Sequence, residues 1–152
     1  MSIDAVYNAK ILDYAGNIGR IGRLDDAQGT AKAHSKLCGS TVIADVKVED
    51  GAVSDYAQDV KACALGQASA SILAKNVVGS TREDLVQVRQ QMLAMLKENG
   101  SPPTGKFEEL KFLEPVRDYK ARHASTMLVF DAVLNAFDQA VGEKPGKSDA
   151  AA

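Results

Sequence analysis

The sequence contains only two cysteines and no tryptophan, and it has no long apolar run. A helix that crosses a bilayer needs roughly 20 consecutive apolar residues, and no window of this chain approaches that length. The first residues also lack the basic and apolar regions of a secretory signal. We therefore expect a cytoplasmic protein that does not associate with a membrane.

An excess of positive charge is absent as well. The chain has 18 lysines and arginines against 20 aspartates and glutamates, which gives a formal net charge of -2 at pH 7. A nucleic-acid-binding domain normally carries a basic patch or stripe. We therefore expect no nucleic-acid partner.

The composition is typical of one globular domain. A chain of 152 residues, of which 45% are hydrophobic and 25% charged, can bury a core without disulfide or metal support. We expect a single domain over residues 1–141. Residues 142–152 contain no apolar anchor, and their composition predicts a disordered tail.

A β-hairpin is predicted around Asp50 and Gly51. Between residues 41 and 48, every even position carries an apolar side chain, and three of the four odd positions carry a polar one. This period of two predicts a strand with one buried face. Asp-Gly favours a two-residue turn because glycine tolerates positive φ. Cys38 begins one arm and Cys63 follows the other, each twelve residues from the turn. The hairpin should therefore bring both thiols to the same end of the sheet.

Helical spacing of apolar residues predicts four helices around this hairpin. The helix after Cys63 is rich in small residues and can approach another element closely. The next one has Ser80 and Glu83 at capping-box spacing and should end at Asn99-Gly100, with Met92 and Met95 as core residues. The expected ranges are Ile3 to Tyr14, Ala64 to Val78, Ser80 to Glu98, and Ala124 to Val141.

The two thiols allow more than one interpretation. In the cytosol, a cysteine pair is more often metal-binding, catalytic or merely buried than joined as a disulfide. Backbone N–H groups at a helix start would favour a thiolate at Cys63, and thiolates bind soft metals. No CxxC-type spacing supplies further ligands, and cysteine is among the most often buried residues. Spacing alone leaves a metal site and two inert core thiols equally open.

Three segments resemble the ligand regions of a known family. In order, they are LCGSTV, CALGQASAS and PVRDYKARHASTML, and they resemble the three sites of the U-type iron-sulfur cluster scaffold family, the NifU, IscU and SufU group. The resemblance extends from the N-terminal helix to about Phe137. It implies an α+β fold in which an antiparallel sheet of about three strands packs against several helices. It also implies that Cys38 is the first ligand and Cys63 the second.

Two further features resemble the Suf-type branch of this family. One is the long stretch between the second and third sites, which contains Ser80 to Pro115. The other is Arg122, which precedes the third site by three residues. The resemblance therefore implies a protein closest to the SufU-like members.

The sequence departs from the family pattern at two ligand positions. Ser125 stands where the family has its third cysteine, and Ser40 stands where it has the aspartate of Cys-Gly-Asp. A serine hydroxyl is a poor metal ligand because it loses its proton with difficulty. His123 is the best local replacement and, with Ser125, a tentative metal ligand; His34 is the weaker candidate and should be solvated. The family's third cysteine usually receives sulfur, so its absence puts direct persulfide acceptance in doubt.

The resemblance implies an iron-sulfur cluster assembly scaffold rather than an enzyme. Such a protein would hold iron or a [2Fe-2S] cluster transiently through Cys38 and Cys63 and transfer it to apoproteins, with a cysteine desulfurase as its sulfur-supplying partner. Two chains could share one cluster as a homodimer, because all-thiolate ligation of a [2Fe-2S] unit needs four thiolates. No orienting acid or oxyanion hole is identifiable for a catalytic Cys-His pair.

Two alternatives stay open beside the scaffold. In the first, Cys38, Cys63 and His123 hold zinc in a SufU-like sulfur-transfer partner. In the second, the chain is a metal-free interaction protein with a degenerate site.

Among other polar features, Arg20 and Arg23 form either a docking surface or solvated charge. The acidic pairs Asp25-Asp26 and Glu108-Glu109 are expected to be solvated or capping groups.

Overall fold

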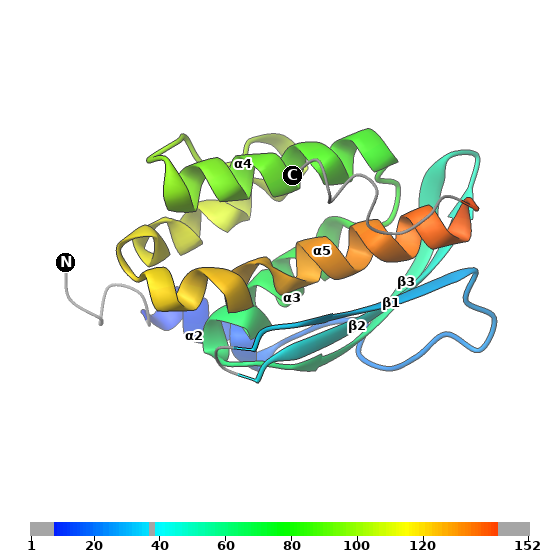
Figure 1. Cartoon of the computed structure of the whole chain (residues 1–152), viewed down its shortest axis with the longest axis horizontal. Coiled ribbons are helices and arrows are strands. Elements are labelled where there is room, and N and C mark those ends of the chain that lie inside the picture. The colour runs from blue at the N-terminus through cyan, green and yellow to red at the C-terminus, as the bar shows by residue number, and fades with distance from the viewer. Residues whose placement is uncertain (1–7, 37–38, 143–152) are drawn as a thin grey trace.

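The structure, a computed structural model, describes residues 8–36 and 39–142. Three antiparallel strands form one sheet in the order β1-β2-β3. Figure 1 shows the helices on one side of this sheet, with α5 and α3 lying between it and α4. The strands are β1 (Gly29–His34), β2 (Thr41–Glu49) and β3 (Ala52–Lys61), the α-helices α2 (Ala9–Gly16), α3 (Ala64–Asn76), α4 (Arg82–Lys97) and α5 (His123–Ala140), and the 3-10 segments η1 (Gly105–Asp118) and η2 (Lys120–Arg122).

This arrangement confirms the α+β fold with a three-stranded sheet that the sequence resemblance implied. Helix α2 begins at Ala9, because Asn8 has an extended backbone (φ −75°, ψ 172°) and caps it. The expected helix from Ile3 to Tyr14 was therefore wrong at Asn8, and residues 3–7 lie outside the described residues. The expected disordered tail lies there too, apart from Gly142. In the described part of the chain, no helix is long and apolar enough to cross a membrane.

The hairpin turns at Asp50 and Gly51, as predicted. Both residues have positive φ, 53° and 79°, which is the conformation of a two-residue type I′ turn. The pairing has one irregularity: Lys47 pairs with Asp55 but Val48 pairs with Val53, so Ser54 is an extra residue in β3. This β-bulge shifts the register of the two arms by one residue relative to a hairpin that is symmetric about the turn.

The capping box of α4 was predicted one residue too early. Thr81 is the N-cap: its side chain accepts a hydrogen bond from the backbone N–H of Asp84, and the Asp84 carboxylate accepts one from the backbone N–H of Thr81. Ser80 is instead fully buried and donates its hydroxyl to the carbonyl of Asn76. The helix ends at Lys97, just before Asn99 and Gly100, as expected.

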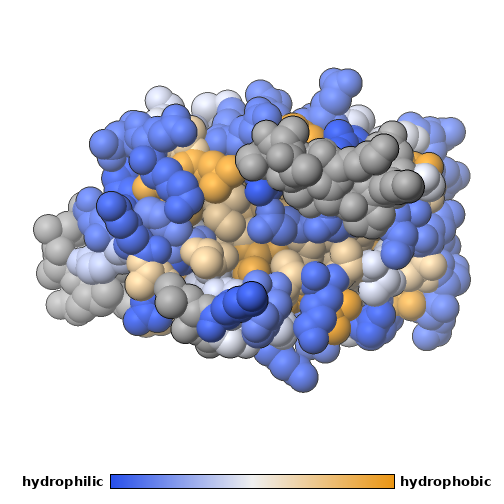
Figure 2. All heavy atoms as spheres, viewed as in Figure 1, coloured by the Kyte–Doolittle hydropathy of each residue, from blue (hydrophilic) through white to orange (hydrophobic). Residues whose placement is uncertain are grey.

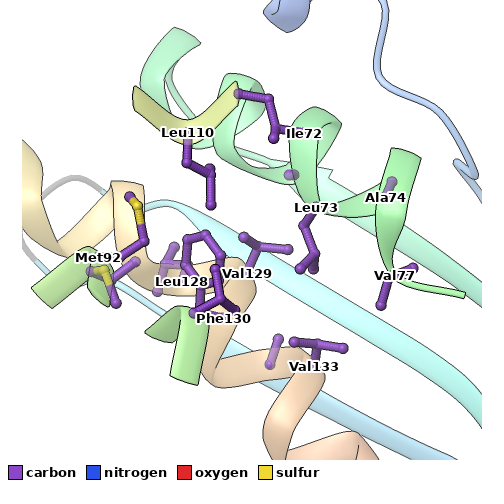
Figure 3. Close-up of a cluster of buried hydrophobic side chains, with 14 of the residues drawn as sticks. Ile72, Leu73, Ala74, Val77, Met92, Leu110, Leu128, Val129, Phe130 and Val133 are labelled. Atoms are coloured by element: carbon purple, nitrogen blue, oxygen red, sulfur yellow. The ribbon is translucent and has the colours of Figure 1, made fainter. Parts of the chain in front are cut away.

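One continuous hydrophobic core joins the helices to the inner face of the sheet. Figure 3 shows side chains of α3, η1, α4 and α5 converging around Phe130, which is fully buried. Met92 and Met95 belong to this core, as predicted. Figure 2, in the view of Figure 1, shows hydrophilic residues around the rim of this face and hydrophobic residues across its middle.

Helix α5 packs very closely on β1. A Cβ atom placed on Gly29 would overlap the backbone carbonyl of Ala136 and crowd the backbone nitrogen of Ala140. Only glycine allows the helix and the strand to approach this closely. This contact fixes α5 along the sheet and thereby fixes the position of its N-terminus.

Strand β2 has a buried residue on each of its faces, so the prediction of one buried face was wrong. Asp45 lies on the face opposite Ala44 and Val46, yet it is fully buried. Its carboxylate accepts hydrogen bonds from the Arg23 guanidinium, the Thr30 hydroxyl and the backbone N–H of Leu24. Burial alone would raise the pKa of Asp45, but these hydrogen bonds outweigh it and lower the pKa. The segment before β1 therefore covers this face.

Arg20 and Arg23, in the segment between α2 and β1, consequently have structural contacts. Arg23 forms an ion pair with Asp45 at 2.6 Å. Arg20 lies 3.4 Å from the carboxylate of Asp55, and its backbone carbonyl accepts the N–H of Gln58. The sequence left a docking surface and solvated charge open for these arginines. The structure shows that Arg23, although its side chain is 54% exposed, anchors the segment to the sheet through Asp45.

Candidate functional site

The three strands end together at one edge of the sheet. His34 of β1 pairs with Thr41 of β2, and Thr41 pairs with Lys61 of β3. The connection between β1 and β2 is closed at its base, where the N–H of Ser35 donates to the carbonyl of Ser40. We call this edge the site end, because Cys63 follows β3 here and Cys38 belongs to the β1–β2 connection. Cys38 itself lies outside the described residues, so its distance from Cys63 stays a prediction.

Cys63 occupies the N-cap position of α3. Its backbone is extended, with φ −67° and ψ 172°, and its carbonyl accepts the N–H of Gln67 to begin the helix. An N-cap is usually a residue whose side chain bonds the helix amides. Within the described chain, the half-buried Cys63 thiol makes no such capping bond. The sulfur is therefore available for another partner.

Cys63 and Ser125, which the resemblance places at the second and third ligand positions, meet in the structure. The Cys63 Sγ lies 3.2 Å from the Oγ of Ser125, which is the third residue of α5 and almost fully buried. The Ser125 hydroxyl is also 3.3 Å from the carbonyl of Arg122. Sixty-two residues separate the two side chains in sequence, and the convergence of the α3 and α5 N-termini brings them together.

A small residue permits this convergence. A Cβ placed on Gly66 would lie 3.1 Å from the Ser125 carbonyl oxygen and 2.8 Å from the Ala62 Cβ. Side chains larger than hydrogen at Gly66 would push the first turns of the two helices apart. The small-residue helix predicted after Cys63 therefore does approach another element closely.

His123 has a different environment from Ser125, although it precedes it by only two residues. It is 3% exposed, and its Nε2 lies 3.0 Å from the carbonyl oxygen of Val116 and 3.2 Å from that of Arg117. A carbonyl only accepts hydrogen bonds, so Nε2 carries a proton and donates it. A metal could therefore bind only through Nδ1, and ligation by His123 stays a prediction.

The remaining candidates do not complete a described metal site. In residues 8–36 and 39–142, no three His, Cys, Asp or Glu side chains are grouped closely enough to hold a metal ion. His34 is exposed, as expected, and Ser40 is buried. A complete ligand set for iron or zinc would therefore need Cys38, a second chain or an external ligand in addition to Cys63.

The acidic pairs have ordinary structural roles. Asp26 forms an exposed ion pair with Lys47. Glu109 accepts hydrogen bonds from the Tyr14 hydroxyl and from Lys75, and the Tyr14 bond is the main reason that its pKa is lowered. This cluster joins α2, α3 and η1.

Comparison with known proteins identifies the family. The family model of the NifU-like N terminal domain matches residues 6–125. The chain belongs to this family. The matched segment includes both cysteines and ends at Ser125, so the whole site described above lies within it.

Similar proteins with names or solved structures agree with this assignment. The chain is 27% identical to the iron-sulfur cluster assembly scaffold protein IscU of Thermotoga maritima, over 90% of this chain and 95% of that protein. It is 55% identical to the crystal structure of a nitrogen-fixing NifU-like protein (N-terminal) from Brucella abortus, with a TM-score of 0.89 over 91% of this chain and 96% of that one. A putative SUF-system scaffold from Fervidobacterium islandicum shares the fold, with a TM-score of 0.81 at 17% identity over 90% and 99% of the two chains.

Proposed function

We propose that this protein is an iron-sulfur cluster assembly scaffold that holds its cargo through the thiolates of Cys38 and Cys63. Membership of the NifU-like family and the scaffold names of its relatives support this function. The observation that carries it in the structure is the Cys63 thiol, which begins α3 without capping it and faces the family's third ligand position. The cargo is iron or a [2Fe-2S] cluster, which recipient apoproteins would take up as their own thiolates replace those of the scaffold.

The third position limits the chemistry of this chain. The Ser125 oxygen cannot accept persulfide sulfur as a cysteine thiol does, so sulfur delivered by a cysteine desulfurase would have to reach Cys63 or Cys38. The Ser125 oxygen, whose proton is donated to the carbonyl of Arg122, can instead accept a hydrogen bond from the Cys63 thiol, since the two atoms are 3.2 Å apart. With two thiolates per chain, a [2Fe-2S] cluster with four thiolate ligands requires two chains.

Anaerobic reconstitution with iron and sulfide tests the proposal. Wild-type protein should develop charge-transfer absorption in the visible region, and the Cys63→Ala and Cys38→Ala variants should lose most of it. Ser54→Ala is the control, because Ser54 is exposed in β3 at the hairpin end of the sheet, and the variant keeps both thiols and Ser125. Persistence of the absorption in a double Cys38→Ala, Cys63→Ala variant would contradict thiolate binding.

Metal analysis of the purified chain separates this function from its alternatives. Colourless protein with stoichiometric zinc would favour a zinc-binding sulfur-transfer partner, and size-exclusion chromatography after reconstitution would show whether two chains share a cluster. Protein that holds no metal, and whose melting temperature does not change with a chelator or after reconstitution, would indicate a metal-free interaction protein.

A further inference from the structure

The chain covers the two edges of the sheet to different extents. At the β3 edge, Gln58 exchanges backbone hydrogen bonds with residues 20–22, and Val53 does so with residues 79–80. The opposite edge is β1, and no described segment outside β2 pairs with it. An unpaired strand edge is a template on which another strand can add. The fold therefore protects one edge of the sheet and leaves the other open.

The open edge consists of the backbone groups of Lys32 and His34. The N–H of Ser35 points toward β2, whereas the N–H of Thr30 leaves the sheet and donates to the side chain of Gln139. Backbone groups alternate in direction along an antiparallel strand, so the N–H and C=O groups of Lys32 and His34 also point away from β2. No hydrogen bond joins these groups to another element of the described chain. They can pair only with a further strand or with water.

A partly apolar hollow lies beside the open edge. It has a volume of about 350 Å³ and lies between β1, α4 and α5, with His34 and Ser35 on its strand side. Leu93, Met127 and Leu128 form its apolar wall. In Figure 1, α5 lies between α4 and β1, and Figure 2 shows hydrophobic residues across the middle of this view. Because the helices cover the inner face of the sheet, inner side chains of a strand added to β1 would enter this hollow.

The surroundings of the open edge are positively charged. Lys32 is exposed on the outer side of β1, and Lys97 and Lys120 line the hollow together with a second hollow of about 470 Å³. None of these three lysines pairs with a carboxylate among the described residues. Opposite charges on neighbouring strands stabilise a sheet, so the open edge favours acidic side chains in an added strand.

A second copy of this chain is a poor occupant of the open edge. Two β1 strands paired antiparallel about a two-fold axis would bring the Lys32 side chains of both copies together on one face, and like charges that face each other are destabilising. Their inner side chains would be those of Ala31 and Ala33, which are too small to fill the hollow. A lysine in an edge strand commonly protects against such self-pairing.

We propose that β1 and the hollow bind an extended segment of a partner protein in which acidic and apolar residues alternate. The segment would add antiparallel to β1 as a fourth strand, a mode of peptide recognition in which backbone bonds give affinity and alternate side chains give specificity. Its backbone would bond Lys32 and His34, its acidic side chains would lie beside Lys32, and its apolar side chains would enter the hollow near Leu93. The proposal goes beyond cluster assembly and does not depend on it.

A labelled heptapeptide of alternating glutamate and leucine is the probe, and fluorescence anisotropy measures its binding to the full chain at constant ionic strength. Saturable binding is expected. A peptide of the same composition with its leucines adjacent should bind more weakly on the order of tenfold, because it cannot keep all its apolar side chains on one face. Absence of saturable binding, or equal binding of the two peptides, would overturn the proposal.

Methylation of the peptide backbone tests the strand pairing itself. In an antiparallel pair, the residue opposite Lys32 exchanges both backbone hydrogen bonds with it, and its side chain lies on the same face, so this residue is a glutamate. N-methylation of the glutamates should therefore weaken binding on the order of tenfold or more. N-methylation of the leucines, whose N–H groups point away from β1, should have little effect. Any other order of the two peptides would refute antiparallel addition to β1.

A charge variant tests which edge of the sheet is used. Lys32→Glu should weaken binding on the order of tenfold, because it replaces attraction by repulsion beside the glutamates. Lys61→Glu is the matched control: Lys61 is also exposed, but it lies in β3 at the other edge. Equal losses in the two variants would show that the peptide responds to net charge rather than to the open edge.

A filled hollow tests the apolar contact without removing a core residue. Ala124 is exposed and lines the hollow, whereas the exposed Ala121 does not. Ala124→Trp should therefore weaken binding, and Ala121→Trp should not. Equal affinity in these two variants would exclude the hollow as the site of the leucines.

Sedimentation of the chain alone tests the competing occupant. A concentration-dependent dimer that Lys32→Glu alters would show that a second copy occupies the open edge, and it would overturn the proposal. None of these measurements involves iron or sulfide, so their failure is distinguishable from failure of the scaffold function.

Discussion

The Oγ of Ser125 lies 3.2 Å from the Sγ of Cys63, so the third family position is in contact with the second although it carries a hydroxyl. Ser125→Cys should place a third thiol beside Cys63. If the scaffold function is correct, a cluster reconstituted on this variant should lose its visible absorption to a chelator more slowly than wild type. Ser125→Ala, which adds no thiol, should not slow the loss, and an equal rate in all three proteins would contradict the prediction.

Gly66→Ala should destabilise the protein through the contact between α3 and α5. The added Cβ would lie 2.8 Å from the Ala62 Cβ and 3.1 Å from the Ser125 carbonyl oxygen. Overpacking of this kind typically costs about 1–3 kcal/mol of unfolding free energy, which urea denaturation can measure. Gly16→Ala is the matched control, because Gly16 ends α2 and a Cβ there meets nothing within 4 Å. A loss as large in Gly16→Ala would show that the close contact is not the cause.

Asp45→Asn should lower stability because it removes the charge that binds Arg23 across the sheet. Hydrogen bonds to charged groups contribute about 1.5–3 kcal/mol, and Asp45 is fully buried with three donors. Asp26→Asn removes an exposed ion pair to Lys47 and should change stability far less, because water and salt screen an exposed pair. The prediction fails if chemical denaturation gives the same result for both variants.

The same carboxylate should make stability depend on acid pH. The folded pKa of Asp45 is lowered, because its hydrogen bonds outweigh the effect of burial. Its contribution is therefore complete above the unfolded value of about 3.9 and is lost as the pH falls through the lower folded value. Glu109, whose pKa is lowered mainly by the Tyr14 hydroxyl, acts in the same direction. Melting temperatures measured from neutral to acid pH should fall less steeply in Asp45→Asn than in wild type.

Alkaline pH should also destabilise the protein, because the folded state raises the pKa of two tyrosines instead of lowering it. Burial raises the pKa of both Tyr14 and Tyr56, and the hydrogen bond to Glu109 adds to the effect at Tyr14. The folded state then holds these protons while the unfolded state releases them, so stability falls once the pH exceeds the ordinary tyrosine value of about 10. Tyr14→Phe should reduce this decline in urea titrations. An unchanged alkaline profile would show that Tyr14 does not contribute.

The sequence predicted the elements whose signals are local. The Asp50-Gly51 turn, the end of α4 and the apolar face of α5 each depend on a few neighbouring residues. The buried Asp45 could not be predicted from alternation, because its burial depends on a segment that crosses the sheet some 20 residues earlier. The bulge at Ser54 likewise leaves no sign in the pattern of apolar residues.

The candidate site was predictable only in part. Spacing brought Cys63 to the site end of the sheet, but the partnership with Ser125 came from family resemblance rather than from any spacing rule. The proximity of Lys97 and Lys120, which line the same two hollows, had no signal in the sequence, because one ends α4 and the other begins η2. His123 was identified as a potential ligand, but only the structure shows that its Nε2 is already committed to two carbonyls.

The meeting of Cys63 with Ser125 also places the starts of two helices side by side. The aligned peptide dipoles of each helix are equivalent to about half a positive elementary charge at its first turn. The two helix starts together therefore act like roughly one positive charge at this point. That field does not depend on which side chain occupies the third position. An anionic group at this point would therefore be attracted by the backbone whether a thiol or a hydroxyl occupies residue 125.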